Sequence, residues 1–278
     1  MSFENVVESH WAPDEPGEIL ARIDAGLTKL GKNPSDLTHD DLLAVDEFHI
    51  RGREATEELA SVAEVTAADH VIDIGSGIGG PSRFLAATRE CRVEGVDLTA
   101  EYCRIAEALA DRIGLSERLG YRQANALELP FEDETFDVAW TQHISMNIED
   151  KESMFREMYR VVKPGGRAAI YDPIAGPGGP LELPVPWARE ASMSFLVDAD
   201  RTRATLEAVG FRIESWRDVS QESLAWFRRN AELARERGPQ PLGLHLLLGA
   251  DWPSMAANMA SNIDQGRITV IQALARKA

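Results

Sequence analysis

The chain has few cysteines and no long apolar run, and each absence narrows the kind of protein it can be. Two cysteines, Cys91 and Cys103, among 278 residues are too few for a disulfide framework, so we expect a reducing, cytoplasmic setting. No stretch approaches the roughly 18 consecutive apolar residues that cross a bilayer. The first ten residues, MSFENVVESH, lack the basic and apolar regions of a signal peptide. We therefore expect no membrane insertion.

Positive charge is also scarce. The sequence has 29 Lys and Arg against 46 Asp and Glu, a formal net charge of −17. Such a surface repels phosphate backbones and anionic lipids, so we expect no nucleic-acid partner. The six histidines are scattered without the spacing of a ligand set, and we expect no metal site.

What the sequence does have is a regular alternation of strand and helix patterns. Short apolar runs are separated by amphipathic segments that close on glycine, which favours a mostly parallel sheet with helices on both faces. We expect an α/β, Rossmann-like doubly wound sheet with an antiparallel final strand. The expected strands are 71–74, 92–98, 121–126, 136–143, 167–173, 211–216 and 267–275, and the expected helices are 18–31, 53–65, 81–88, 100–113, 150–162, 200–209, 220–237 and 252–265.

The sequence on either side of this pattern suggests that the chain has four parts. Residues 1–52 are expected to form an N-terminal helical cap, 53–173 the ligand-binding core, and 201–278 the rest of the core sheet and its helices. Between them, residues 174–200 contain the proline- and glycine-rich stretch AGPGGPLELPVPWARE, which cannot form a regular element. This insertion after the fifth strand is either a lid beside the ligand or a surface linker.

The stretch VIDIGSGIGG, residues 71–80, runs from a strand into nearly bare backbone. Gly75, Gly77 and Gly80 fit G-x-G-x-x-G, while Gly75, Gly77 and Gly79 fit G-x-G-x-G. Without side chains, the backbone can approach a cofactor closely. Asp97 ends the next strand, about 20 residues on, where a carboxylate can bind ribose hydroxyls. The loop alone does not separate a nicotinamide dinucleotide from S-adenosylmethionine.

An ordered series of motifs carries a family resemblance. DIGSGIGG, GVDL, NALELPF, FDVAW and RVVKPGGR follow one another between residues 70 and 173. In this order they resemble the class I S-adenosylmethionine-dependent methyltransferases. The resemblance implies S-adenosylmethionine as cofactor and S-adenosylhomocysteine as product, with Leu98 against the adenine and His143 beside the donor methyl. The implied cofactor-binding residues are Asp73, Gly75, Ser76, Gly77, Gly79, Asp97, Leu98, Asn125, Ala126, Gln142 and His143.

The flanks are most similar to small-molecule enzymes of the sarcosine/dimethylglycine N-methyltransferase group and its ubiquinone/menaquinone, phosphoethanolamine and tocopherol relatives. VDEFHIRGREATEELA, residues 45–60, resembles the stretch that closes over the cofactor in such enzymes. We therefore expect N-methylation of a small amine or amino acid such as sarcosine or dimethylglycine. C- or O-methylation of a quinol-like metabolite, an NAD-dependent oxidoreductase and a non-catalytic cofactor-binding protein stay open, as does a homodimer.

Several side chains are candidates for the acceptor chemistry. His143 and His49 are candidate bases, with packing as the alternative for each. Tyr171 and Trp187 follow the fifth strand and are candidates for the acceptor pocket. An arginine is the natural clamp for an acceptor carboxylate, and the choice lies among Arg51, Arg189, Arg53 and Arg201, unless they are only surface charge. Aromatic rings for a methylated ammonium are available at Trp11, Trp140 and Trp187.

Overall fold

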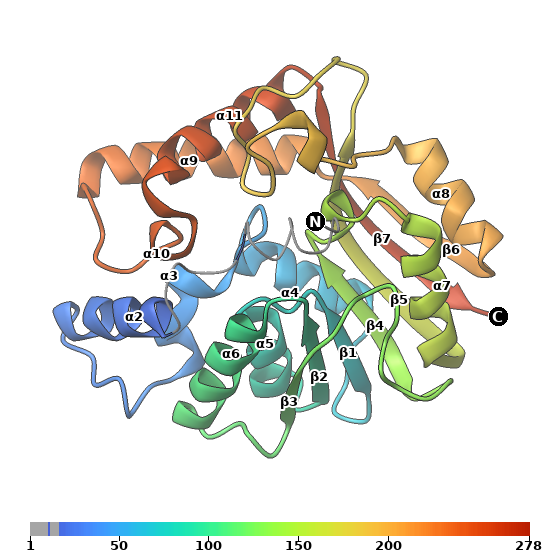
Figure 1. The fold of residues 1–278 in the computed structure, drawn as a ribbon, viewed down its shortest axis with the longest axis horizontal. Coiled ribbons are helices and arrows are strands. Elements are labelled where there is room, and N and C mark those ends of the chain that lie inside the picture. The colour runs from blue at the N-terminus through green and yellow to red at the C-terminus, as the bar shows by residue number, and fades with distance from the viewer. Residues whose placement is uncertain (1–10, 12–16) are drawn as a thin grey trace.

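A computed structural model of the chain describes Trp11 and residues 17–278. One sheet of seven strands forms its centre, in the order β3-β2-β1-β4-β5-β7-β6 (Figure 1). The first five strands run parallel, and β7 is antiparallel to both of its neighbours, β5 and β6. The strands are β1 (His70–Ile74), β2 (Arg92–Asp97), β3 (Leu119–Gln123), β4 (Phe136–Gln142), β5 (Val162–Ala175), β6 (Phe211–Asp218) and β7 (Ile268–Lys277).

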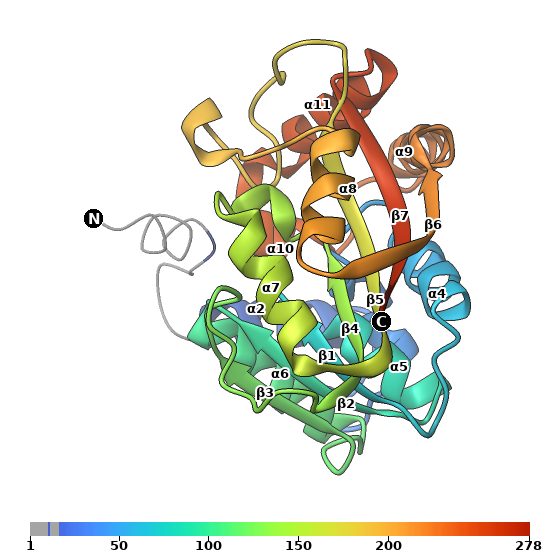
Figure 2. The same ribbon diagram turned by 90° about the vertical axis from the view of Figure 1, so that its right-hand side faces the viewer.

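Helices cover both faces of the sheet. Figure 2 shows α7 and α8 on one side of the sheet and α4 and α9 on the other. The longer helices are α2 (Glu18–Lys29), α4 (Arg53–Val62), α5 (Gly80–Thr88), α6 (Ala100–Arg112), α7 (Lys151–Val161), α8 (Ala199–Ala208), α9 (Ser220–Arg237) and α11 (Trp252–Asp264). The shorter ones are η1 (His39–Leu42), α3 (Leu43–Asp46), η2 (Ser145–Asn147), η3 (Ala191–Met193), α10 (His245–Leu248) and η4 (Gly249–Asp251). The doubly wound class expected from the sequence is confirmed.

Alternate residues of each buried strand feed two separate apolar clusters, because successive side chains of a strand point to opposite faces. Val71 of β1 packs with residues of α4, α5, α9 and α11, whereas its neighbour Ile72 packs with residues of α7 and α8. A third cluster joins α2 to α6 beyond the edge of the sheet, through residues such as Ile23 and Leu109. The N-terminal helices are thereby fixed to the core.

The chain order reverses beside β1, which pairs with β2 on one side and β4 on the other. The connections from β1 and β4 then leave in opposite directions, so a crevice opens beyond their carboxyl ends. Ile74 and Gln142 end the two strands. The fold therefore places the glycine loop after β1 beside the residues that follow β4.

A buried ion pair holds the N-terminal segment over this crevice. Arg83 of α5 is fully buried, and its Nη2 atom lies 2.5 Å from Oδ1 of Asp46, at the end of α3. Its Nη1 atom donates to the carbonyl of Ile78. Next to this pair, a Cβ on Gly80 would lie 2.2 Å from the backbone oxygen of Asp46, so only glycine fits there.

The local boundaries differ from the expectations at a few places. The third strand spans 119–123 rather than 121–126, so Asn125 and Ala126 lie in the turn that follows it. The helix expected over 150–162 spans Lys151–Val161, and the strand expected over 167–173 is longer, spanning Val162–Ala175. The short helix α10 was not expected.

No helix within the described part of the chain is long and apolar enough to cross a membrane. Among the same residues, no group of three or more His, Cys, Asp or Glu side chains is placed to hold a metal ion.

We expect Arg83→Leu to lower the free energy of unfolding by about 3–5 kcal/mol, because it leaves the Asp46 carboxylate buried without its partner. The double variant Arg83→Leu/Asp46→Leu should recover most of this loss, since both buried charges are then removed together. Urea unfolding of the wild type, both single variants and the double variant gives the coupling energy. A double variant no more stable than Arg83→Leu would contradict the importance of the pair.

Candidate active site

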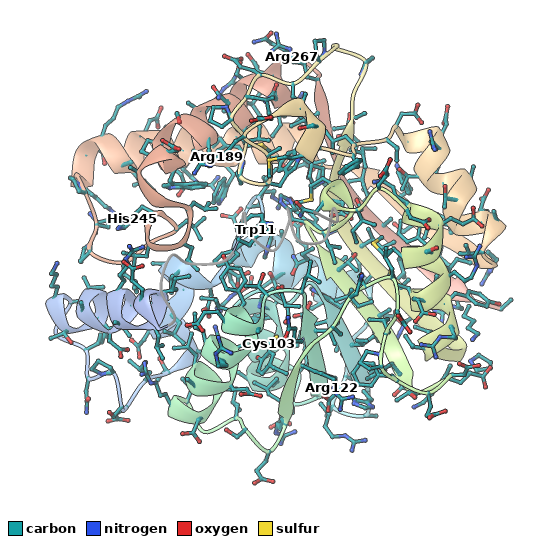
Figure 3. The ribbon with its side chains drawn as sticks, viewed as in Figure 1. Trp11, Cys103, Arg122, Arg189, His245 and Arg267 are labelled. Carbon is teal, nitrogen blue, oxygen red and sulfur yellow. The ribbon has the colours of Figure 1, made fainter. Side chains whose placement is uncertain are left out.

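A cavity of about 280 Å³ lies beyond the carboxyl ends of β1, β2 and β4. Its walls come from the loops that follow these strands, from the N-terminal segment and from the insertion after β5. Figure 3 shows Trp11 near the centre of the molecule, between the sheet and the upper helices. The lining residues are Trp11, Phe48, Ile74, Gly75, Gly77, residues 96–99, Tyr102, residues 124–127, Gln142, His143, Ile144, residues 146–150, Pro186 and Trp187.

The glycine loop presents bare backbone to this cavity. Gly75 and Gly77 both line it and both have positive φ, 76° and 55°. The amide of Gly75 donates to the carbonyl of Val96 over 2.7 Å, which ties the loop to the end of β2. A side chain at Gly75 would meet Ile144 at 2.8 Å. The loop therefore needs glycine for its conformation and for its close contacts.

Asp97 lies on the same wall, at the end of β2. Its Oδ2 atom accepts from the amide of Gly77 at 2.9 Å, and its Oδ1 atom accepts from the amide of Thr99 at 2.8 Å. Burial raises the pKa of this carboxyl, while the two amide bonds oppose the rise. The amides hold the carboxyl in one orientation at the cavity wall.

Three of the residues expected to contact a cofactor lie behind the wall and do not line the cavity. Asp73 is buried and accepts a 2.5 Å hydrogen bond from Ser82 Oγ, and burial raises its pKa to about 7. Ser76 is buried, and its hydroxyl has no hydrogen-bond partner among the described residues. A Cβ on Gly79 would lie 2.5 Å from the Tyr121 hydroxyl oxygen. These residues shape the loop from below.

Leu98, Asn125 and Ala126 all line the cavity, as expected. Asn125 accepts from the amide of Leu127 through Oδ1 at 3.0 Å, and this bond closes the turn after β3. Nδ2 of Asn125 makes no hydrogen bond within the described residues. The Nδ2 donor of Asn125 and the apolar side chain of Leu98 therefore both belong to residues that line the cavity.

Gln142 and His143 line the cavity directly after β4. His143 has φ of 57°, a conformation that non-glycine residues rarely adopt. Its Nε2 atom accepts from the amide of Ile50 at 3.4 Å, and its ring stacks on Tyr171 with centroids 5.8 Å apart. Burial lowers the pKa of His143 well below its ordinary value, with a smaller contribution from His49. The imidazole is therefore neutral at physiological pH.

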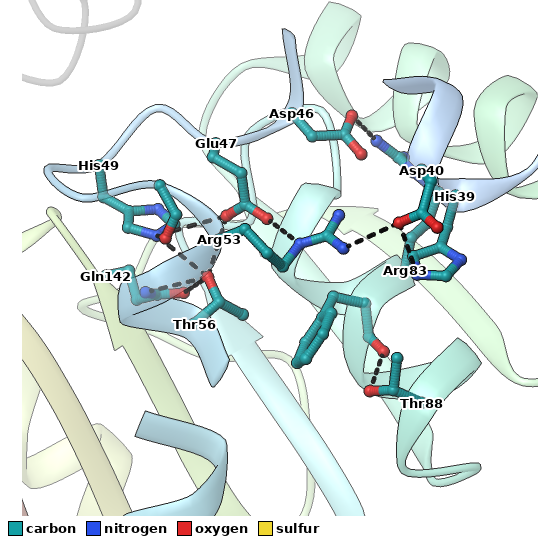
Figure 4. A network of polar contacts seen from close by, with 12 residues as sticks. His39, Asp40, Asp46, Glu47, His49, Arg53, Thr56, Arg83, Thr88 and Gln142 are labelled. Atoms are coloured by element: carbon teal, nitrogen blue, oxygen red, sulfur yellow. Dashed lines mark hydrogen bonds and ion pairs between the residues drawn. The ribbon is translucent and has the colours of Figure 1, made fainter. Parts of the chain in front are cut away.

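His49 is buried in the network drawn in Figure 4. Its Nε2 atom lies 3.0 Å from the carbonyl of Gly52, 3.0 Å from Thr56 Oγ1 and 3.3 Å from Glu47 Oε2. Because a carbonyl only accepts, Nε2 carries the proton, and Nδ1 is a free acceptor that makes no hydrogen bond within the described residues. Burial lowers the pKa of His49, and the Glu47 carboxylate opposes this shift.

Trp187 and Tyr171, both expected at an acceptor pocket, have different positions. Trp187 comes from the insertion after β5, lines the cavity and donates from Nε1 to Ser194 Oγ at 3.0 Å. Tyr171 lies beneath His143, fully buried, and does not line the cavity. Its hydroxyl has no hydrogen-bond partner within the described part of the chain, and burial raises its pKa to about 12.

The structure does not bring the expected arginines Arg51 and Arg189 to the cavity. Arg51 forms two hydrogen bonds with the Glu58 carboxylate, of 2.6 and 3.0 Å. Arg189 is half-exposed and pairs with Asp251 beside α11, apart from Trp11 in Figure 3. Both guanidinium groups therefore already have a carboxylate partner.

Some residues that line the cavity were not predicted from the sequence. Phe48 stands over Gly77, where a Cβ would lie 3.5 Å from its ring. Tyr102 also lines the cavity, and its buried hydroxyl has no hydrogen-bond partner among the residues that the structure describes. The stretch 146–150 forms a further part of the wall. Phe48 lies in the segment 45–60, and the similarity of this segment to a stretch that closes over the cofactor could have indicated its position. Tyr102 is a single tyrosine on an amphipathic helix, and nothing in the sequence indicates that it reaches the cavity.

Comparisons with known proteins show which proteins the chain is similar to. Residues 72–170 match the family described as a methyltransferase domain. Methyltransferase GfsG of Streptomyces halstedii is 33% identical over 46% of this chain and 46% of its own length. The 27-O-demethylrifamycin SV methyltransferase of Amycolatopsis mediterranei is 31% identical over 64% of this chain and 66% of its own length. The chain thus matches about half to two thirds of these relatives.

Among solved structures, phosphoethanolamine N-methyltransferase 2 of Haemonchus contortus, crystallised with S-adenosyl-L-methionine, has a TM-score of 0.75. The two share 18% sequence identity, over 100% of this chain and 60% of that one. At this identity the likeness concerns the fold alone.

The burial of Asp73 behind the cavity wall can be tested through the pH dependence of stability. Its folded-state pKa of about 7 lies above its ordinary value of 3.8. The protonated form is therefore favoured by folding, and this contribution is present below about pH 4 and lost as the pH rises to about 7. Asp73→Asn keeps an acceptor for Ser82 without the charge. We expect the variant to gain roughly 3 kcal/mol relative to the wild type between pH 4 and pH 7.

Urea unfolding of both proteins across this pH range measures the difference. Asp46 and Asp172, whose carboxyl pKa values burial also raises to about 6, are present in both proteins and cancel. A difference that does not change with pH would show that Asp73 ionises as freely in the folded chain as in the unfolded one.

Proposed function

This chain belongs to the S-adenosylmethionine-dependent methyltransferases through its residues 72–170, and on that premise we propose that it transfers a methyl group to a small molecule. The observation that carries the proposal is the meeting of two features on one cavity wall. The bare backbone of Gly75 and Gly77 lies beside the Asp97 carboxylate, at the carboxyl ends of adjacent parallel strands. Both features lie within the matched residues.

The cofactor is proposed to lie along this wall. Asp97 receives the two ribose hydroxyls, since its oxygens are held in place by backbone amides. The adenine lies between Leu98 and the turn at Asn125, and the methionine part passes Gly75 toward His143. Asp73, Ser76 and Gly79 support this site from behind the wall, and Gln142 completes it at the end of β4.

The methyl acceptor is proposed to approach from the side of His143 and Trp187. Transfer is an in-line displacement at sulfur, so holding the nucleophile, the methyl group and the sulfonium in line supplies most of the rate gain. N-methylation of a small amine such as sarcosine or dimethylglycine stays a prediction. The paired state of Arg51 and Arg189 favours it less, because neither is free to bind a carboxylate. The relative from Amycolatopsis is named for a hydroxyl oxygen, which supports O-methylation as the second candidate.

For a hydroxyl acceptor, His49 is proposed as the base. Its Nε2–H is held by the Gly52 carbonyl and the Glu47 network, which leaves Nδ1 to take the hydroxyl proton. The oxygen lone pair forms the new O–CH₃ bond, and the electrons of the S–CH₃ bond return to sulfur. His143, whose Nε2 already accepts from Ile50, orients the acceptor and is the alternative base.

A nicotinamide dinucleotide would use the same loop and the same carboxylate. The family match and the order of motifs between residues 70 and 173 favour S-adenosylmethionine over this alternative.

We expect the purified chain to bind S-adenosylhomocysteine and not NADH in calorimetry. Incubated with S-adenosylmethionine, it should methylate one class of small acceptor, detected by mass spectrometry together with stoichiometric S-adenosylhomocysteine. The panel contains sarcosine, dimethylglycine, phosphoethanolamine, a quinol and a hydroxylated macrolide.

Asp97→Ala should weaken S-adenosylhomocysteine binding roughly 10- to 100-fold, the effect of losing charged hydrogen bonds. The matched control is Glu107→Ala, an exposed acid of α6. Binding of NADH, or equal binding by both variants, would refute the assignment of the wall.

We expect His49→Gln to lower kcat on a hydroxyl acceptor roughly 10²- to 10⁴-fold, because the proton then has no acceptor. S-adenosylhomocysteine affinity should not change. Because burial lowers the pKa of His49, wild-type kcat/KM should fall toward acidic pH as the imidazole becomes protonated, and this fall should lie at lower pH than for an ordinary histidine.

Glu47→Gln separates a charge effect from a packing effect. Burial and Arg53 lower the pKa of His49, whereas Glu47 and the Gly52 carbonyl raise it, so removing the Glu47 charge should move the acidic limb to still lower pH. A limb that stays in place while activity falls would leave Glu47 a packing residue. Full activity of His49→Gln would shift the role of base to His143.

A further inference from the structure

A second, smaller chamber adjoins the cofactor cavity on the acceptor side. The two spaces share four wall residues, Phe48, His143, Pro186 and Trp187. The remaining walls come from the segment after Phe48, from α9 and from the region of α10 and α11. The helices α9, α10 and α11 lie beyond residue 170, outside the part of the chain that matches the methyltransferase domain. The chamber is therefore built largely by segments outside the matched domain.

The lining of this chamber is mostly aromatic. Five rings face it from four segments: Phe48, Trp187, Trp226, Phe227 and Trp252. Aliphatic side chains fill the gaps between them. No Asp, Glu, Lys or Arg side chain lines the chamber among the residues that the structure describes. Apart from the indole N–H groups, its polar side-chain groups are the imidazoles of His49 and His143.

The charged groups nearby are already neutralised. The guanidinium of Arg51 is bound by Glu58, and that of Arg53 by Glu47. A carboxylate or phosphate entering this chamber would lose its hydration without gaining a counter-ion, which is strongly unfavourable. The same holds for an ammonium group, which would find aromatic faces but no acid. An uncharged apolar group suffers neither penalty and gains from leaving water.

We propose that this chamber binds the apolar, uncharged part of the methyl acceptor and places its reacting hydroxyl at the wall shared with the cofactor cavity. The proposal rests on the proposed function, because the reacting methyl group must come from the cofactor cavity. His143 lines both spaces, so the shared wall is where acceptor and methyl donor meet. His49, on the chamber side only, is in place to take the hydroxyl proton.

The chamber is narrow in this structure. Its volume is about 20 Å³, close to the space that holds a single water molecule. An acceptor therefore enters by moving part of the wall. Trp226 and Trp252 are partly exposed, unlike the fully enclosed Trp187, so both have room to move.

The test uses a neutral apolar probe, N-phenyl-1-naphthylamine, titrated by fluorescence into the chain saturated with S-adenosylhomocysteine. We expect one probe to bind per chain. Trp252→Glu should weaken probe binding at least about tenfold, because a carboxylate then faces the apolar ligand. The position suits an acid, since it begins α11, where negative charge is favourable. Leu43→Glu, at an exposed apolar position outside the chamber, is the matched control and should bind as the wild type does.

S-adenosylhomocysteine binding, measured first by calorimetry, confirms that each variant is folded and separates the two proposals. If it is absent in the wild type, the proposed function fails. If it is present and the probe does not bind, or binds equally to Trp252→Glu, the apolar chamber is refuted and the function stands. Should Trp252→Glu not fold, Trp226→Glu replaces it.

Tetramethylammonium tests the remaining alternative, an aromatic cage for a methylated cation. Under our proposal it does not displace the probe from the wild type. Displacement of the probe, together with tighter tetramethylammonium binding by Trp252→Glu, would assign the chamber to a cationic acceptor and overturn the proposal.

Discussion

The buried ion pair between Arg83 and Asp46 fixes the geometry on which the rest of the site depends. Arg83 belongs to the helix that begins directly after the glycine loop, and Asp46 ends the segment that crosses above it. The pair brings the two backbones so close that Gly80 has no room for a Cβ. Residues that follow Asp46 along the chain, Phe48 and His49, are thereby placed over the carboxyl ends of the strands. One interaction outside the cavity therefore sets its roof.

A second constraint is the way charge is distributed around the cavity. Acids such as Asp73 lie buried behind the wall, with pKa values raised by burial, whereas the arginines near the acceptor side are each bound to a carboxylate. Asp97 is held at the cavity surface by two backbone amides, and Glu149 and Asp150 line the cavity as well. A chain with a strongly negative surface thus presents the acceptor with a largely uncharged, aromatic environment. The acidity of the whole sequence is informative about partners in solution and says little about the site.

The parts that could be predicted from sequence are those set by short-range pattern. The strand, glycine loop and helix around Gly75 follow from local residue preferences, and the position of Asp97 follows from the next strand, so both reach the cavity as expected. Arg51 could not be placed in this way, because its partner is a surface-type acid on the following helix. The aromatic chamber could not be predicted from the sequence either, because residues such as Trp226 on amphipathic helices have the spacing of ordinary core residues. Tertiary pairing, rather than local propensity, decides these positions.

The proposed chemistry links these two constraints. Methyl transfer to a neutral hydroxyl removes the positive charge from sulfur and, through the hydroxyl proton, creates one on the base. In an apolar chamber that new charge is stable only beside a fixed negative partner. His49 has such a partner in Glu47, 3.3 Å away and itself held by Arg53 and Thr56. His143 contacts no acid among the described residues and is held neutral by burial. The segment anchored by Arg83 therefore supplies both the roof over the cofactor and the one imidazole whose protonation the site can stabilise.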